Sequence, residues 1–246
     1  MNENANWLVS KLQLKYQPVG MMFADSIPEE AVYLKKSGTA CIAPLIFSAA
    51  KGKTVAIDKN STGYGCSAFY LGYADWIFDG IEYFLSNGPV PTDRECERFI
   101  KTPALAKEFV ESYIPKQQTS KTYIFKPLLS FKEDETPETV LFFANPDQLS
   151  ALVFLIQHNH PLDFDRIKTG FASACMAMAT IPLKYARNGE SKAFWGLHDL
   201  AVRMHLPKDI MSMAMPYALF EEICALAPDS FLVTETWKQI EGRLGV

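Results

Sequence analysis

The hydrophobic positions in the first half of the chain change between helical and strand-like spacing. Apolar residues three or four apart predict amphipathic helices, and short unbroken apolar runs predict buried strands. Lys51-Gly52-Lys53 and Asn87-Gly88-Pro89 carry the glycine or proline that commonly ends a helix. The segment 58–65 is expected to be a loop. The predicted helices of this half cover residues 5–15, 40–50, 76–84 and 105–113, and the predicted strands cover residues 18–23 and 54–57.

The second half continues this alternation and contains the clearest helix start. Asn145 can cap a helix, Pro146 suits the first helical position, and Asp147 favours the positive end of the helix dipole. Pro182 is expected to bend or interrupt a later helix. The predicted strands cover residues 122–126, 139–143, 192–195 and 211–215, and the predicted helices cover residues 145–158, 174–186, 216–226 and 230–244.

A short pattern occurs once in each half. Ala40-Cys41-Ile42-Ala43 opens a predicted helix that ends in a basic residue and a glycine, and a strand follows. Ala174-Cys175-Met176-Ala177 opens a second predicted helix with the same kind of ending and a following strand. If the pattern reflects a duplication, a pseudo-two-fold axis brings the two cysteine-bearing helix starts to equivalent positions that face a shared cleft.

The alternation of strands and helices predicts the fold class. No linker rich in glycine, serine or proline divides the elements, so we expect one domain over residues 1–246. The expected fold is α+β or α/β, with a mixed sheet flanked by helices in a single compact domain. The repeated pattern suggests two duplicated halves, at about residues 1–120 and 121–246.

Composition and charge exclude several classes of protein. The 246 residues are 48% hydrophobic and 13% aromatic, which excludes disordered, collagen-like and coiled-coil chains. A formal net charge of -4 gives no electrostatic reason to bind nucleic acid or an anionic membrane. No apolar run approaches the roughly 20 residues that span a bilayer, and no signal-peptide pattern opens the chain, so we expect a cytoplasmic protein. The five cysteines contain no CxxC pair, which argues against a disulfide framework and a zinc ribbon.

Several motifs in one colinear order resemble a known family. They are residues 14–20 (LKYQPVG), the helix that begins near Cys41, residues 63–66 (GYGC) followed by Leu71-Gly72, residues 143–148 (FANPDQ), residues 195–203 (WGLHDLAVR) and residues 215–217 (MPY). Together they resemble the bacterial and archaeal family catalogued as domain of unknown function 169. The resemblance implies a stand-alone cytoplasmic protein of prokaryotes with no agreed activity.

This chain departs from the family pattern at two places. The family cysteine that matches Cys66 commonly opens a Cys-Pro-Gly-Gly-like turn, whereas this chain reads Cys66-Ser-Ala-Phe. Many members have a Gly-Cys-x-Gly sequence where this chain reads Phe194-Trp195-Gly196. One of the family's thiols is therefore missing here, which argues against a cysteine-ligated metal centre shared with the family.

The segment Gly63-Tyr64-Gly65-Cys66 is the best local candidate for a ligand-binding loop. Glycines permit unusual backbone dihedrals and let main-chain N–H groups approach a ligand, and the loop ends in a thiol. Its spacing lacks the third glycine of a dinucleotide fingerprint and the GK[ST] of a phosphate-binding loop. The alternative interpretation is a tight turn that ends in a structural cysteine.

Cysteine, histidine and arginine side chains elsewhere supply further candidates. If Cys41, Cys66 and Cys175 converge, their soft thiolates favour zinc, copper(I) or an iron–sulfur cluster, with His198 as a fourth ligand. The alternative for Cys41 and Cys175 is close helix packing in the core. Arg203 could hold a ligand carboxylate or phosphate while His198 exchanges a proton. The alternative for Arg203 is an ion pair with Asp199, four residues earlier on the same helix face.

These residues support three hypotheses about function. The first is a protein that binds a small ligand or cofactor in a cleft between two related halves. The second is a zinc or iron–sulfur protein of anaerobic redox metabolism, and the third is a structural or protein-binding subunit without catalysis. No serine triad, HExxH motif or pair of catalytic carboxylates is present to specify a reaction. The ligand-binding candidates are Gly63, Gly65, Cys66, Cys175, His198 and Arg203, and the metal-binding candidates are Cys41, Cys66 and Cys175.

Overall fold

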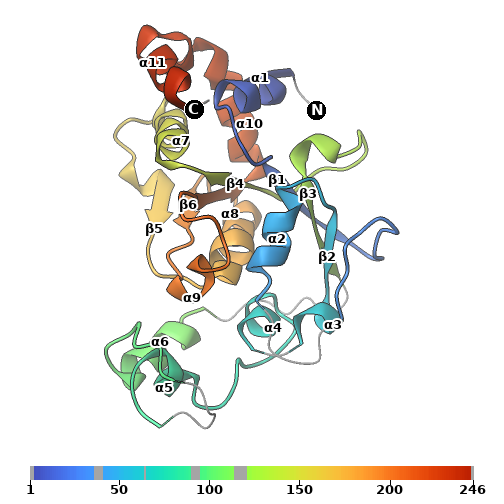
Figure 1. The fold of residues 1–246 in the computed structure, drawn as a ribbon, viewed down its shortest axis with the longest axis vertical. Coiled ribbons are helices and arrows are strands. Elements are labelled where there is room, and N and C mark those ends of the chain that lie inside the picture. Colours follow the sequence, from blue (N-terminus) through green and yellow to red (C-terminus); the bar gives the residue numbers. More distant parts are fainter. Residues whose placement is uncertain (1–2, 36–40, 64, 90–94, 114–120, 245–246) are drawn as a thin grey trace.

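A seven-stranded mixed sheet crosses the middle of the molecule (Figure 1). The computed structural model describes residues 3–35, 41–63, 65–89, 95–113 and 121–244. The order of its strands is β2-β3-β1-β4-β7-β6-β5. The strands are β1 (Val19–Ala24), β2 (Val55–Ile57), β3 (Thr122–Pro127), β4 (Thr139–Ala144), β5 (Ile167–Thr169), β6 (Ala193–Gly196) and β7 (Met211–Pro216).

The strand directions confirm a mixed sheet. Strand β5 runs parallel to β6, and the other neighbouring strands pair antiparallel. Within β4, Leu141 and Phe143 belong to the hydrophobic cluster on one face of the sheet, whereas Val140 and Phe142 belong to the cluster on the other. Because side chains alternate across a strand, a continuous apolar run such as 139–143 fits a strand covered on both faces. The fold is a single compact α+β domain, as predicted.

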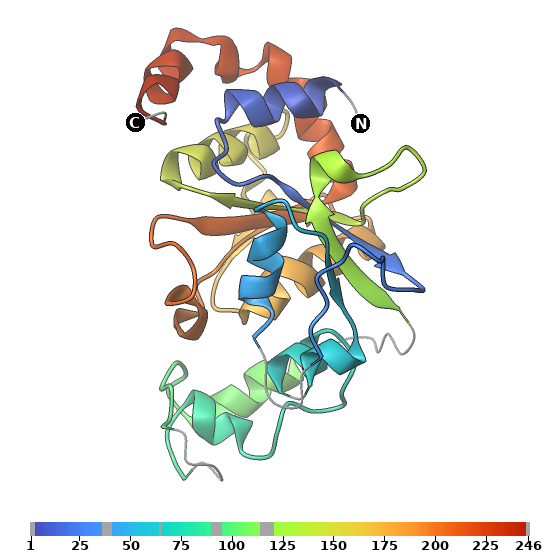
Figure 2. The same cartoon turned by 45° about the vertical axis from the view of Figure 1, so that its right-hand side comes forward.

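Helices cover both faces of the sheet, and a further helical layer lies beyond one of them (Figures 1 and 2). On the first face lie α1 (Glu3–Lys11), α7 (Pro146–Gln157), α10 (Tyr217–Leu226) and α11 (Glu235–Leu244). On the second face lie α2 (Ala43–Ala49), α8 (Ile181–Asn188) and the short α9 (Leu200–Arg203). The further layer, called the lower layer below, contains α3 (Lys59–Thr62), α4 (Cys66–Tyr70), α5 (Ile81–Leu85) and α6 (Pro103–Glu111).

The helix starts show how local sequence sets this arrangement. Asn145 caps α7 by accepting a hydrogen bond from the Gln148 N–H at 3.0 Å, and the Gln148 side chain accepts one from the Asn145 N–H at 3.0 Å. This reciprocal pair confirms the predicted helix start. The predicted loop at 58–65 is partly wrong, because Asp58 caps the short helix α3 through the N–H groups of Asn60 and Ser61.

The helix predicted at 174–186 is present, and its middle is not regular α-helix. Residues 174–175 and α8 are α-helical, and Met176–Thr180 between them form a π-helical turn. Pro182 follows helical residues 174–181 directly and has no N–H to donate to the turn before it, so the departure from α-helical geometry ends at the proline. The interruption therefore lies before the proline, next to Cys175.

Six strands of the sheet form two equivalent groups of three. From the outside inwards, these groups are β2-β3-β1 and β6-β7-β4. Strand β3 pairs antiparallel with both β1 and β2, and β7 pairs antiparallel with both β4 and β6. The inner strands β1 and β4 pair antiparallel with each other. A duplication would leave this pattern. In this pattern β3 groups with β1 and β2, so a duplication would divide the chain between β3 and β4, later than the predicted halves of about 1–120 and 121–246. The duplication itself stays a prediction. No helix within the described residues has both the length and the apolar character that crossing a membrane requires.

Candidate functional site

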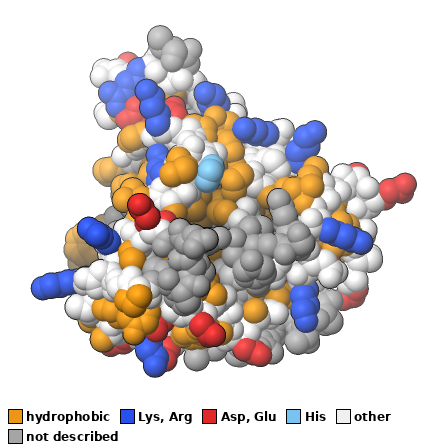
Figure 3. Space-filling model, turned by 60° about the horizontal axis from the view of Figure 1, so that its bottom comes forward, with side chains coloured by type: hydrophobic (Ala, Val, Ile, Leu, Met, Phe, Trp, Pro, Cys, Tyr) orange, Lys and Arg blue, Asp and Glu red, His pale blue; other side chains and the backbone are white. Residues whose placement is uncertain are grey.

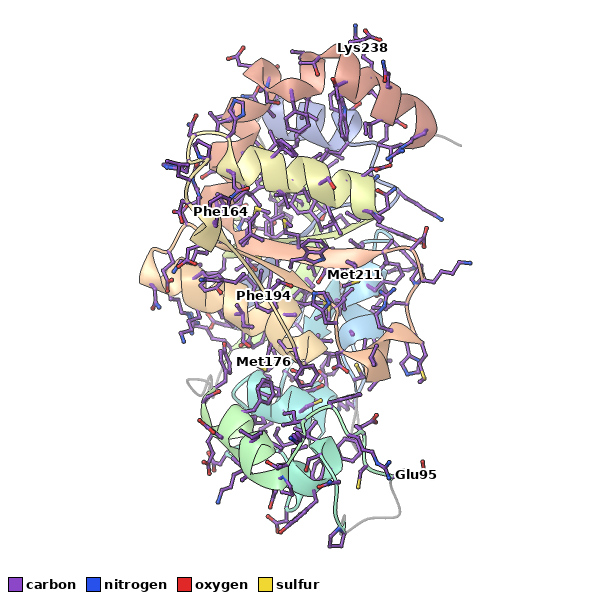
Figure 4. The ribbon with its side chains drawn as sticks, turned by 90° about the vertical axis from the view of Figure 1, so that its left-hand side faces the viewer. Glu95, Phe164, Met176, Phe194, Met211 and Lys238 are labelled. Atoms are coloured by element: carbon purple, nitrogen blue, oxygen red, sulfur yellow. The ribbon has the colours of Figure 1, made fainter. Side chains whose placement is uncertain are left out.

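A pocket of about 300 Å³ lies between the lower layer and the second face of the sheet. Its walls come from α4, α5 and α6, from the segment before Cys175, and from α9 with the residue that caps it. Met176, labelled in Figure 4, marks the junction between the helices under the sheet and the lower layer. The surface at this end of the molecule carries hydrophobic side chains interspersed with charged ones (Figure 3). The polar lining residues are Cys41, Cys66, Tyr70, Glu97, Ser173 and Asp199.

Aromatic rings form most of the apolar wall. The ring of Phe171 stacks on Phe109 with centroids 5.2 Å apart and meets Phe99 edge-on at 5.5 Å. Phe78 and Phe84 contact each other edge-on at 5.8 Å. Aromatic pairs in these geometries contribute about 0.5–1.5 kcal/mol beyond the area they bury. Phe171 therefore ties the lower layer to the segment that leads into Cys175.

Glycine geometry places Cys66 at the base of this pocket. Gly63 and Gly65 both have positive φ, 61° and 96°, a region that side chains other than glycine rarely adopt. Gly65 caps α4 and lines the pocket, and Cys66 is the first residue of that helix. Gly63 ends α3 and is not among the lining residues. The half-buried Cys66 thiol faces the pocket.

Cys175 lies behind Cys66, at the start of the π-helical turn. It is 1% exposed and is not among the residues that line the pocket. Its Sγ lies 3.5 Å from the Ser67 Oγ. The π-helical turn packs closely against β6 at Gly196. A Cβ added at Gly196 would lie 2.5 Å from the Cβ of Ala177, inside the turn. Turns of this π-helical kind are frequent at functional sites.

The two thiols affect each other's ionisation. A hydrogen bond from the Cys175 thiol to Cys66 stabilises the Cys66 thiolate and lowers the pKa of Cys66, against the opposing effect of its burial. The same hydrogen bond, followed by burial, raises the pKa of Cys175 well above its ordinary value. Cys66 is therefore the thiol that ionises first, and Cys175 retains its proton.

Cys41 and Asp199 complete the polar end of the pocket. The Cys41 thiol is exposed to water, but the protein atoms around it partly desolvate the thiolate and raise the pKa of Cys41 to about 11. Cys41 and Cys66 line the same pocket, whereas Cys175, the other cysteine of the repeated pattern, is not among the lining residues. Asp199 accepts hydrogen bonds from the N–H groups of Ala201 at 3.2 Å and Ala174 at 3.3 Å. Burial raises the pKa of Asp199 despite these bonds.

Cys41, Cys66 and Cys175 are the predicted ligands for zinc or an iron–sulfur cluster. Within the described part of the chain, no group of three or more His, Cys, Asp and Glu side chains has the geometry to hold a metal ion. His198, the predicted fourth ligand, hydrogen-bonds through Nε2 with the Thr169 Oγ1 at 3.0 Å, outside the pocket lining. The described residues therefore give the predicted metal centre no geometric support, and that centre stays a prediction.

Arg203 does not form the predicted ion pair with Asp199. Its guanidinium donates hydrogen bonds to the backbone carbonyls of Ile210 at 2.5 Å and Lys208 at 2.8 Å, which closes the turn after α9. The predicted ion pair with Asp199 is wrong, because Asp199 lies at the N-cap of α9 and its carboxylate accepts from backbone N–H groups instead. Arg203 and His198 are both absent from the lining of the pocket.

Sequence reasoning missed the aromatic wall and the role of Asp199. Phe99, Phe109 and Phe171 belong to three separate segments, and no spacing in the sequence connects them. Asp199 carried one usable signal, since an aspartate directly before a helix is a preferred N-cap residue. The additional hydrogen bond from Ala174 to Asp199 depends on the tertiary fold.

Comparisons with known proteins identify a family and nothing more specific. The model of the DUF169 family, described as uncharacterised ArCR, matches residues 7–225. No curated protein and no solved structure matches the chain.

Proposed function

The chain belongs to the uncharacterised DUF169 family, and from its pocket we propose that it binds a small, largely apolar ligand that carries no negative charge. The observation that carries the proposal is a pocket lined mostly by aromatic and aliphatic side chains, with a few polar side chains among them, Cys66 and Asp199 included. Small-molecule sites have this composition, mostly apolar walls with a few polar groups that fix the orientation of the ligand.

Size limits the ligand to a compact molecule. The pocket volume of about 300 Å³ is at the lower end of the range of about 300–1,000 Å³ found for small-molecule sites. Planar rings suit the walls, since the faces and edges of Phe99, Phe109 and Phe171 can stack against them. A compact aromatic molecule of one to three rings suits these dimensions.

Charge limits the ligand further. The two ionisable acids in the lining are Glu97 and Asp199, and none of the described lining residues is Lys, Arg or His. An anionic ligand would meet two carboxyl groups with no cation to offset them, so repulsion and desolvation both oppose its entry. Neutral and cationic ligands avoid this penalty.

The experiment uses N-phenyl-1-naphthylamine, a neutral three-ring fluorophore whose emission rises in apolar surroundings. Ala201 lines the pocket but is exposed, so the Ala201→Trp variant should narrow the pocket without disturbing the core. Ala225, exposed on α10 on the opposite face of the sheet, provides the matched control Ala225→Trp.

We expect saturable fluorescence enhancement with the wild-type protein and with Ala225→Trp, and an affinity at least tenfold weaker for Ala201→Trp. A sulfonated analogue, 1-anilinonaphthalene-8-sulfonate, should bind more weakly than the neutral probe. Equal binding of the neutral probe by both tryptophan variants would contradict the proposal, because the probe would then be binding elsewhere.

A further inference from the structure

Cys66 and Cys175 differ in their access to the pocket. Cys66 is half-buried and lines the pocket, so a bound molecule can reach its sulfur. Cys175 is 1% exposed and does not line the pocket, and its Sγ lies 3.5 Å from the Oγ of Ser67, the residue that follows Cys66 in α4. Of these two thiols, Cys66 is therefore the one that a molecule in the pocket meets.

Other chemistry at this end of the pocket has little support. The Asp199 carboxylate accepts hydrogen bonds from two backbone N–H groups, so its oxygens are already engaged in holding α9 against the segment before Cys175. The described residues offer no metal-binding group of three or more ligands. What remains is sulfur chemistry, for which an accessible thiolate next to a protonated thiol is the usual requirement.

We propose that this pocket carries out thiol–disulfide exchange with a small aromatic disulfide that is neutral or cationic, with Cys66 as the attacking thiol and Cys175 as the resolving thiol. The inference rests on the proposed function, because the disulfide must first bind in the aromatic pocket. It adds the substrate class and the reaction.

The exchange balances in two steps. The Cys66 thiolate attacks one sulfur of R–S–S–R, a Cys66–S–S–R bond forms, and R–S⁻ leaves. The Cys175 sulfur then attacks the Cys66 sulfur, the bond between Cys66 and S–R breaks, and the proton of the Cys175 thiol goes to the leaving sulfur as R–SH. The ligand disulfide gains two electrons and the two cysteines lose them as they form a Cys66–Cys175 disulfide. A dithiol reductant in solution returns the pair to its starting state.

Cys41 is the natural competitor for the second step, because it also interacts with Cys66 and lines the pocket. Cys41 is exposed, whereas Cys175 is buried with its Sγ 3.5 Å from the Oγ of Ser67, the residue next to Cys66. The structure therefore assigns the resolving step to Cys175. The experiment must identify which thiol becomes linked to Cys66.

The experiment uses 4,4′-dithiodipyridine, a neutral aromatic disulfide that releases a coloured thione for each sulfur displaced. The wild-type protein should release two thiones per chain in its fast phase, retain no pyridyl group, and show a Cys66–Cys175 linked peptide by mass spectrometry. Cys175→Ser should release one thione in that phase and retain one pyridyl group on Cys66. Cys66→Ser should lose the fast phase.

The controls separate this reaction from unfolding and from general thiol reactivity. Cys224 is buried in the cluster on the other face of the sheet, so Cys224→Ser should react like the wild-type protein. Cys175→Ala provides a second variant that also lacks the resolving thiol, and circular dichroism shows whether each variant is folded. The dianionic 5,5′-dithiobis(2-nitrobenzoate) should react with Cys66 at least tenfold more slowly than the neutral disulfide, after each rate is divided by that of free cysteine.

Two results would overturn the inference. A pyridyl group retained on Cys66 of the wild-type protein would show that no second thiol resolves it, and a Cys41–Cys66 linked peptide would show that the resolving thiol is not Cys175. Either result leaves the proposed function standing if N-phenyl-1-naphthylamine still distinguishes Ala201→Trp from Ala225→Trp. Conversely, equal probe binding by those variants would contradict the proposed function even if the internal disulfide forms.

Discussion

Removal of the hydrogen bond between the two thiols should make Cys66 harder to ionise. Cys175→Ala removes the donor, whereas Cys175→Ser replaces it with a hydroxyl donor of similar size. Hydrogen bonds to charged groups are worth about 1.5–3 kcal/mol, and the weak S–H donor belongs at the lower end of that range. About 1.4 kcal/mol corresponds to one pKa unit. We therefore expect the pKa of Cys66 to rise by about one unit in Cys175→Ala and to change little in Cys175→Ser.

The assay is alkylation of Cys66 by iodoacetamide, followed by peptide mass spectrometry at a series of pH values. The pKa of Cys66 is lowered in the wild-type protein, so its alkylation should reach half of its maximum below the pH found for an ordinary thiol. In Cys175→Ala that midpoint should move up by about one pH unit. Below the midpoint the thiolate fraction falls about tenfold, and the greater nucleophilicity of the more basic thiolate recovers about threefold, so the net rate should fall about three- to tenfold.

A midpoint in Cys175→Ala that equals or lies below the wild-type value would refute this reasoning. The Cys175→Ser variant guards against a simple packing effect, because it should retain the wild-type midpoint if the donor is what matters. A shift of equal size in both variants would show that the sulfur packing, and not the hydrogen bond, sets the pKa of Cys66.

Three further substitutions test other parts of the site. Asp199→Asn removes a negative charge that raises the pKa of Cys66, so alkylation of Cys66 at neutral pH should become about twofold faster. This effect is opposite in sign to that of Cys175→Ala, and an unchanged or slower rate would count against the electrostatic coupling. Gly196→Ala places a Cβ 2.5 Å from the Cβ of Ala177, so urea denaturation should show a free energy of unfolding lower by about 1–3 kcal/mol, and the pH profile of Cys66 alkylation should shift as the π-helical turn moves. Wild-type behaviour in both measurements would contradict this packing. Asn145→Ala removes the cap of α7 and should cost about 1 kcal/mol in the same denaturation assay without changing Cys66 reactivity, whereas a change in that reactivity would show that the two faces of the sheet are coupled.

Local sequence signals predicted most of the elements that depend on local chemistry. The start of α7 at Pro146 follows from the residues around Asn145, and the structure has the expected capping bonds. The apolar run 139–143 predicted a strand buried on both faces, and β4 lies near the centre of the sheet. In both cases the deciding interactions lie within a few residues or depend on a simple two-residue alternation.

Features that depend on tertiary packing could not be predicted in this way. The π-helical turn at Met176–Thr180 packs against Gly196, which is a distant position in the sequence. Arg203 had an acidic residue at the right helical spacing, but the turn after α9 brings two carbonyl oxygens within its reach. Such contacts depend on where the chain returns, and helical periodicity contains no information about that.

In the candidate site, too, local sequence patterns indicated single residues, whereas the contacts between those residues depend on tertiary packing. The glycines and the thiol at 63–66 marked Cys66 as a position of interest, and the repeated pattern drew attention to Cys41 and Cys175. Whether these three sulfur atoms lie near one another depended on the packing of α2, α4 and the π-helical turn, which the sequence left open. The aromatic wall comes from segments that only the fold brings together.

The most direct test of the account is whether a ligand in the pocket protects Cys66. Alkylation of Cys66 by iodoacetamide would be followed with increasing N-phenyl-1-naphthylamine, with Cys96 as the internal reference, since Cys96 is half-buried and does not line the pocket. If the aromatic walls and the thiol form one site, the Cys66 rate falls in proportion to probe occupancy while the Cys96 rate stays constant. An unchanged Cys66 rate at saturating probe would contradict the account.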